Sequence, residues 1–96
     1  MYQYHDFKLG TDGTSESVMV SGTVDVWIFD LSAGSITMQV LFPASSVSGE
    51  PTWRDFPSGS FSSPMGKTLY IGEEQVRIRF VGTGNTDGSY IRVGRE

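Results

Sequence analysis

The sequence predicts an all-β protein: a single antiparallel β-sandwich, immunoglobulin-like or jelly-roll-like, of about seven or eight short strands. Three observations favour this class. No window of about 11 residues keeps apolar side chains at helical spacing without a glycine or a Ser/Thr cluster interrupting it. Apolar and polar residues instead alternate with the period of two that half-buried strands show. Turn-forming residues separate these segments roughly every 8–12 residues.

The expected strands follow one another within a single domain, residues 1–96. The two nearest the N-terminus, 2–9 and 17–20, are the least well defined, so residues 1–21 form either an arm or edge strands. The other strands are expected at residues 23–30, 35–42, 51–56, 67–71, 75–81 and 89–94. Between them, 57–66 ("PSGSFSSPMG") is expected to be a loop or a weak edge segment.

The strand "GTVDVWIFD" places Val24, Val26 and Ile28 on one face and Trp27 and Phe29 on the other. Trp27 and Phe29 have three possible roles: they are covered within the chain, they contact another subunit, or they form a platform for a sugar or a base. Exposed Trp and Phe on a β domain usually mark a contact surface. We therefore treat both as candidate protein-interface residues.

The core is predicted from the same alternation in two further strands. In "GSITMQVLF", one face carries apolar residues opposite Thr37 and Gln39. In "QVRIRFVG", apolar residues alternate with Arg77 and Arg79. The predicted core residues in these strands are Ile36, Met38, Val40, Ile78 and Phe80.

Two turns are predicted to close hairpins, "LSAGS" at 31–35 and "GTGNTDGS" at 82–89, while "IGEEQ" at 71–75 links two further strands. Arg77, Arg79 and Arg92 would then line the outer face of the last hairpin. These cations are either solvated, paired with Asp25 and Asp30, or paired with the acidic half of a neighbouring copy. We treat the three arginines as candidate protein-interface residues.

No catalytic residue, metal site or cofactor is expected. His5 is the one histidine, near a terminus, and nothing in the sequence supplies the partners of a catalytic triad. Glu73 and Glu74 are adjacent, so on a strand they point to opposite faces. The two Asp-Gly segments, 10–14 and 85–89, favour turns over calcium loops, and the chain has no cysteine for disulfides or thiolate ligands. A role other than catalysis is therefore predicted.

Charge and hydropathy restrict the partners. The net charge of −4 argues against nucleic acid, which normally requires a basic face. No apolar run approaches the roughly 20 residues that span a bilayer. The N-terminus "MYQYHDFKLG" lacks the basic start and apolar core of a signal peptide.

One short stretch resembles a known motif. The pattern Ser46-x-Ser48-x-x-x-Thr52-Trp53 resembles a degraded Asp-box, a hairpin of sialidase blades and other β proteins, with Ser48 in the place of the acid. In that motif the tryptophan packs inward. The resemblance therefore implies that Trp53 is a buried core residue that closes a hairpin between 35–42 and 51–56.

A wider resemblance covers about residues 22–96. The succession of "GSITMQV", "TWRDF", "LYI", "VRIRFVGTG" and a Gly-Ser-aromatic last strand resembles the small β-sandwich structural proteins of tailed bacteriophages. The resemblance implies a virion protein that assembles in the bacterial cytoplasm and binds major capsid or connector proteins and itself, for example as a trimer. We expect capsid decoration; a tail, connector or fibre component and a carbohydrate-binding or adhesin module are the alternatives.

Overall fold

The computed structural model describes residues 2–31, 33–42, 49–84 and 86–95, and six strands form one antiparallel sheet within them. The strands are β1 (Gln3–Lys8), β2 (Val18–Asp30), β3 (Ser35–Phe42), β4 (Thr52–Phe61), β5 (Met65–Thr83) and β6 (Tyr90–Arg95). Their order across the sheet is β1-β6-β2-β5-β3-β4. The all-β class is confirmed. In the described ranges there is no helix long and apolar enough to cross a membrane.

Two strands are much longer than the sequence predicts. β2 has 13 residues and combines the expected strands 17–20 and 23–30, while β5 has 19 residues and runs through the expected turn at 71–75. Each contains a glycine in the left-handed region, Gly22 with φ 69° and Gly72 with φ 122°. The two glycines are register partners, with register shifts beside Gly22. These glycines bend the strands without reversing them.

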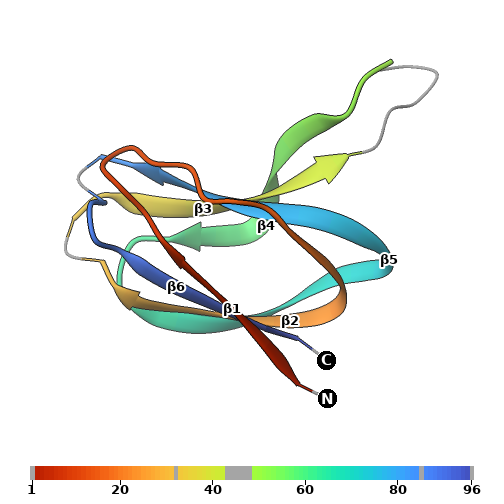
Figure 1. Ribbon diagram of the computed structural model, residues 1–96, viewed down its shortest axis with the longest axis horizontal. Helices are drawn as coiled ribbons and strands as arrows, with labels where there is room; N and C mark the ends of the chain where they lie inside the picture. Colours follow the sequence, from red (N-terminus) through yellow and green to blue (C-terminus); the bar gives the residue numbers. More distant parts are fainter. Residues whose placement is uncertain (1, 32, 43–48, 85, 96) are drawn as a thin grey trace.

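The bend folds the sheet into two layers. The first layer contains β1, β6, the C-terminal part of β2 and the N-terminal part of β5. The second contains β4, β3, the C-terminal part of β5 and the N-terminal part of β2. In Figure 1 the second layer lies above the first. The two layers enclose the core as those of the expected sandwich would, but both belong to one sheet folded on itself.

The core lies between the layers and is one cluster of buried side chains. The first layer contributes Val24, Val26, Ile28, Leu69, Ile91 and Val93, and the second contributes Ile36, Met38, Val40, Phe61, Ile78 and Phe80. The Phe7 ring of β1 packs on the Phe80 ring, with 5.7 Å between centroids. The sequence missed Phe61, which is 1% exposed, because its Ser/Gly/Pro-rich surroundings favour a loop.

Both hairpins predicted at 31–35 and 82–89 are wrong. β2 is not a neighbour of β3, and β5 is not a neighbour of β6, so both connections cross between layers. The second connection instead docks on the loop after β1: Gly88 N donates to Leu9 O (2.9 Å), and Thr86 Oγ1 donates to Gly10 O (2.8 Å). Turn-forming residues signal a change of direction but not which strands will pair. Ser32 and Asn85, within these segments, lie outside the described residues.

Replacing Gly22 with alanine should lower the free energy of unfolding by about 1–2 kcal/mol, because a β-carbon disfavours the left-handed conformation. No atom lies within 4 Å of the position that the new Cβ would take, so the cost is conformational and not steric. Gly10→Ala is the matched control, because Gly10 is equally open but lies outside the left-handed region. Urea denaturation measures both. Equal stabilities for the two variants would contradict the assigned bend.

Candidate functional site

The outer face of the first layer carries two rows of side chains that cross four strands. Residues directly opposite each other in antiparallel strands point to the same side of the sheet. One row is Tyr4, Gly94, Asp25 and Thr68, and the next is Asp6, Arg92, Trp27 and Gly66. The rows bring together residues from both ends of the sequence.

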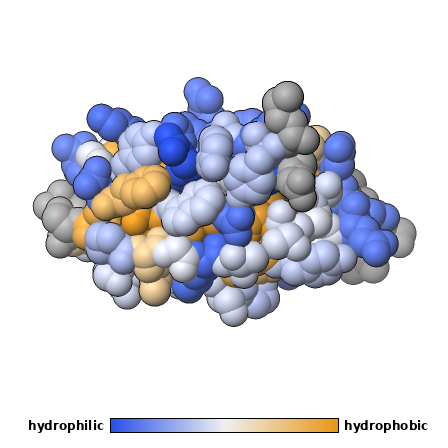
Figure 2. Space-filling view, turned by 90° about the horizontal axis from the view of Figure 1, so that it is seen from below, coloured by the Kyte–Doolittle hydropathy of each residue, from blue (hydrophilic) through white to orange (hydrophobic). Residues whose placement is uncertain are grey.

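This face holds all four tyrosines of the chain together with Trp27 and Phe29. Tyr4, Tyr70 and Phe29 are 56%, 62% and 49% exposed. Figure 2, seen from the first-layer side, shows pale, weakly polar surface with scattered strongly apolar and strongly polar side chains. We call this surface the tyrosine face; it consists of Tyr2, Tyr4, Asp6, Asp25, Trp27, Phe29, Thr68, Tyr70, Tyr90 and Arg92.

Two glycines of the rows lie directly beneath aromatic rings. A Cβ on Gly66 would come within 2.9 Å of Cδ1 of Trp27, and a Cβ on Gly94 would collide with the Tyr2 ring. Each ring therefore occupies the space left by a glycine on a neighbouring strand. This packing leaves Trp27 half-buried and outside the core, so the first of its three predicted roles, complete coverage within the chain, is wrong.

Asp25 anchors the first row. Its carboxylate accepts hydrogen bonds from Thr68 Oγ1 (2.7 Å) and from the hydroxyl of Tyr2. These two donors stabilise the charged form, so they lower the pKa of Asp25. Tyr2 is thereby held across Gly94.

Arg92 anchors the second row. Its Nε and Nη2 donate to the two carboxylate oxygens of Asp6 at 2.8 and 3.1 Å, a bidentate arrangement. Its guanidinium also lies 5.1 Å from the Tyr4 ring centroid and 5.9 Å from that of Phe29. The hydrogen bonds from Arg92, and then one with Tyr90, lower the pKa of Asp6 from 3.8 to about 2. One arginine thus fixes an acid and two aromatic rings.

The predicted arginine-lined hairpin is wrong, because Arg77 and Arg79 lie on the second layer and Arg92 lies on the first. Arg79 donates from Nε to Gln39 Oε1 (2.9 Å), and its guanidinium lies 4.3 Å from the Trp53 ring centroid. Arg77 is exposed and donates to Ser17 Oγ at 3.3 Å. The candidate arginines therefore do not form one surface.

Trp53 also departs from its expected place. The pairing of β3 with β4 sets it opposite Leu41, on the side of β3 that faces away from Met38 and Val40. It is half-buried, outside the core cluster and against Arg79. The Asp-box resemblance misplaced Trp53, and its Ser46–Ser48 portion lies outside the described residues.

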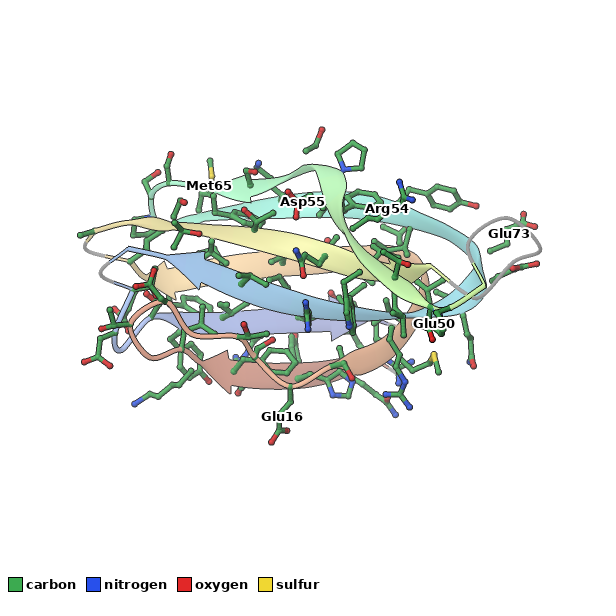
Figure 3. All side chains as sticks on the ribbon, turned by 90° about the horizontal axis from the view of Figure 1, so that it is seen from above. Glu16, Glu50, Arg54, Asp55, Met65 and Glu73 are labelled. Carbon is green, nitrogen blue, oxygen red and sulfur yellow. The ribbon has the colours of Figure 1, made fainter. Side chains whose placement is uncertain are left out.

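In the part of the chain that the structure describes, the titratable groups outside the tyrosine face form no cluster with evident chemistry. His5 is half-buried, with its Nε2 accepting from Arg95 Nε at 3.4 Å. In Figure 3 Glu16 lies well away from Glu50 and Glu73, which are at one end of the molecule. Among the described residues, no group of three or more His, Asp or Glu side chains could hold a metal ion.

Comparison with known proteins leaves the function to be argued from the site. No family model matches the chain, and no curated protein matches it. A fold class alone does not specify a function, so the chemistry of the tyrosine face has to carry the argument.

The Asp6–Arg92 pair makes stability depend on pH. The pKa of Asp6 is lower in the folded protein (about 2) than its ordinary value of 3.8. The contribution of the Asp6 carboxylate to the free energy of unfolding is therefore fully present above about pH 4. It is lost as the pH falls through about 2. Asp6→Asn should therefore lower the urea midpoint at pH 6, and the difference from the wild type should shrink towards pH 2. A difference that stays constant from pH 6 to pH 2 would contradict this role for the ion pair.

Proposed function

We propose that this chain is a non-enzymatic structural protein of a tailed-bacteriophage virion, which decorates the capsid by binding capsid protein through the tyrosine face. The observation that carries the proposal is the gathering of all four tyrosines, Trp27 and Phe29 on one outer face. The virion setting rests on the sequence resemblance described above. The protein would act in the virion after assembly in the host cytoplasm.

The residue types of the tyrosine face suit protein recognition. Tyr, Trp and Arg are enriched in protein interfaces and dominate their binding energy. Aromatic rings supply a large contact area at a small cost in conformational entropy. Here Trp27 and Tyr2 lie over glycines and Arg92 is held by Asp6, so much of that ordering is complete before a partner binds. This pre-organisation favours a binding surface.

Repetition of the protein on the capsid would strengthen its overall binding. Decoration proteins meet a lattice of identical sites, and linked copies bind such a lattice more strongly than one copy does. The proposal therefore needs only moderate affinity from each tyrosine face. It also assigns no role in binding to Arg77 and Arg79, which belong to the opposite outer face.

The double variant Phe29→Ser, Tyr70→Ser should bind purified virions of the encoding phage at least about tenfold more weakly, because each loses an exposed ring of the kind that anchors interfaces. Both residues are about half exposed or more, so the fold should persist. Arg77→Glu, on the opposite face, is the control and should bind normally. Co-sedimentation of labelled protein with the virions measures this. The proposal fails if the double variant binds like the wild type.

A carbohydrate-binding module is the second candidate, because exposed aromatic rings beside carboxylates also suit sugars. Here, however, both oxygens of Asp6 accept from Arg92, and both oxygens of Asp25 accept from Thr68 and Tyr2. These acids therefore offer less to sugar hydroxyls. Binding to a glycan array that Tyr70→Ser abolishes, without binding to virions, would favour this candidate.

A further inference from the structure

The free edge of β1 is open for pairing. β1 is the first strand of the sheet order and, among the described strands, has β6 as its one neighbour. Leu9, just after β1, directs its N–H to Ser89 O and its C=O to Gly88 N. Because these groups alternate in direction along an antiparallel strand, the N–H and C=O groups of Tyr4, Asp6 and Lys8 point away from β6. A hollow separates this edge from residues 14–16 of the other layer.

The other long edges of the sheet are protected in ways that β1 is not. β4, on the opposite side of the molecule in Figure 3, contains Pro57 and a register shift opposite Thr37–Gln39, with Ser58 at φ 66°. At the edge of β5, Lys67 Nζ donates to the carbonyl oxygens of Ser58 (3.1 Å) and Ser60 (2.7 Å). Proline, bulges and inward-pointing charges are the devices that prevent edge pairing.

The remaining edge, at the start of β2, is interrupted: the described chain pairs with β5 at the isolated bridge Thr14–Val81 and then again over residues 18–20. Residues 18–20 end at the bend at Gly22. β1, in contrast, keeps a regular register with β6 over all of its residues, Gln3–Lys8, and contains neither glycine nor proline. It is therefore the edge of the described sheet that is best suited to accept another strand.

We propose that β1 pairs with β1 of a second copy, antiparallel about a twofold axis, so that two sheets become continuous. A twofold axis perpendicular to the sheet keeps the same side of both copies outward, so even residues must face even residues and odd must face odd. Two registers then overlap most of the strand: one centred on His5 and one centred on Asp6. The second places Asp6 opposite itself, which like charges disfavour.

The register centred on His5 is chemically complementary. It sets Tyr4 opposite Asp6 of the second copy, and Lys8 opposite Tyr2 of the second copy. An ammonium beside an aromatic ring is a favourable pair, and Asp6 meets the Tyr4 ring instead of a second carboxylate. The two tyrosine faces become one surface of double width. The biological use of this dimer rests on the proposed role in virion assembly. The residues that test the β1 edge, however, differ from those that test the tyrosine face.

The absence of cysteine from the chain allows a direct test of the axis. His5→Cys places a thiol opposite its own copy in a pair without mutual hydrogen bonds, where Cα atoms are about 4.5 Å apart, within disulfide range. Mild oxidation of the purified variant should therefore give a covalent dimer on a non-reducing gel. Ser63→Cys, in the exposed turn between β4 and β5, is the control and should give far less dimer.

Lys8→Pro tests the edge itself, because it removes an N–H that points away from β6 and so leaves the β1–β6 ladder intact. By light scattering the wild type should have the mass of a dimer and Lys8→Pro that of a monomer, with unchanged circular dichroism. In the His5→Cys background, Lys8→Pro should abolish cross-linking. A monomeric wild type whose His5→Cys variant forms no more disulfide than Ser63→Cys overturns the proposal, as does a dimer that Lys8→Pro leaves intact.

These outcomes are separable from the proposed function. Phe29→Ser with Tyr70→Ser leaves β1 unchanged, so it should remain dimeric while losing virion binding. If the wild type proves monomeric but still binds virions through Phe29 and Tyr70, the edge inference fails and the function stands. If the dimer forms but virion binding is unchanged both in the Phe29→Ser, Tyr70→Ser double variant and in Lys8→Pro, the function fails and the edge inference stands.

Discussion

The whole architecture depends on one pair of glycines. Gly22 and Gly72 face each other across β2 and β5, both in a backbone conformation that other residues rarely adopt. At this point the two longest strands leave one layer and enter the other together. Because they turn as a pair, hydrogen bonding continues on both sides of the bend, and a single sheet encloses its own core. A small domain thereby avoids the loops that two separate sheets would need.

The tyrosine face follows from the same arrangement. The aliphatic side of each strand is buried in the core. The alternate residues of four strands therefore lie together on one outer surface. On that surface glycines lie where large rings from neighbouring strands need room, and Asp6, Asp25 and Arg92 each have a partner within the chain. The side chains of this surface are exposed but already ordered by hydrogen bonds and packing within the chain. Such pre-ordered aromatic side chains lose little conformational entropy when a partner binds.

The sequence was sufficient to predict the features that follow from local periodicity, namely the alternating strand segments and their residues that face the core. Alternation located Ile36, Met38, Ile78 and Phe80, and all of them are buried. It failed where a residue type has two uses: Gly72 bends a strand, although glycine followed by acids also favours a turn. Trp53 was misplaced because a motif was given more weight than its position opposite Leu41. Alternation in residues 23–30 placed Trp27 and Phe29 away from the core, but the tyrosine face as a whole could not be predicted, since it requires the pairing of β1 with β6.

The pairing of the first strand with the last has a kinetic consequence. Gln3 lies opposite Arg95, so β1 finds its neighbour only after the residues up to Arg95 have been made. Contacts this distant in sequence form slowly, because the entropy of closing a long loop is lost before the contact stabilises anything. We therefore expect β1 to join the sheet late, after β6 has left the ribosome. A nascent or truncated copy would lack Arg92 and Gly94, and with them the surface that other subunits would bind, so incomplete chains would be kept out of an assembly.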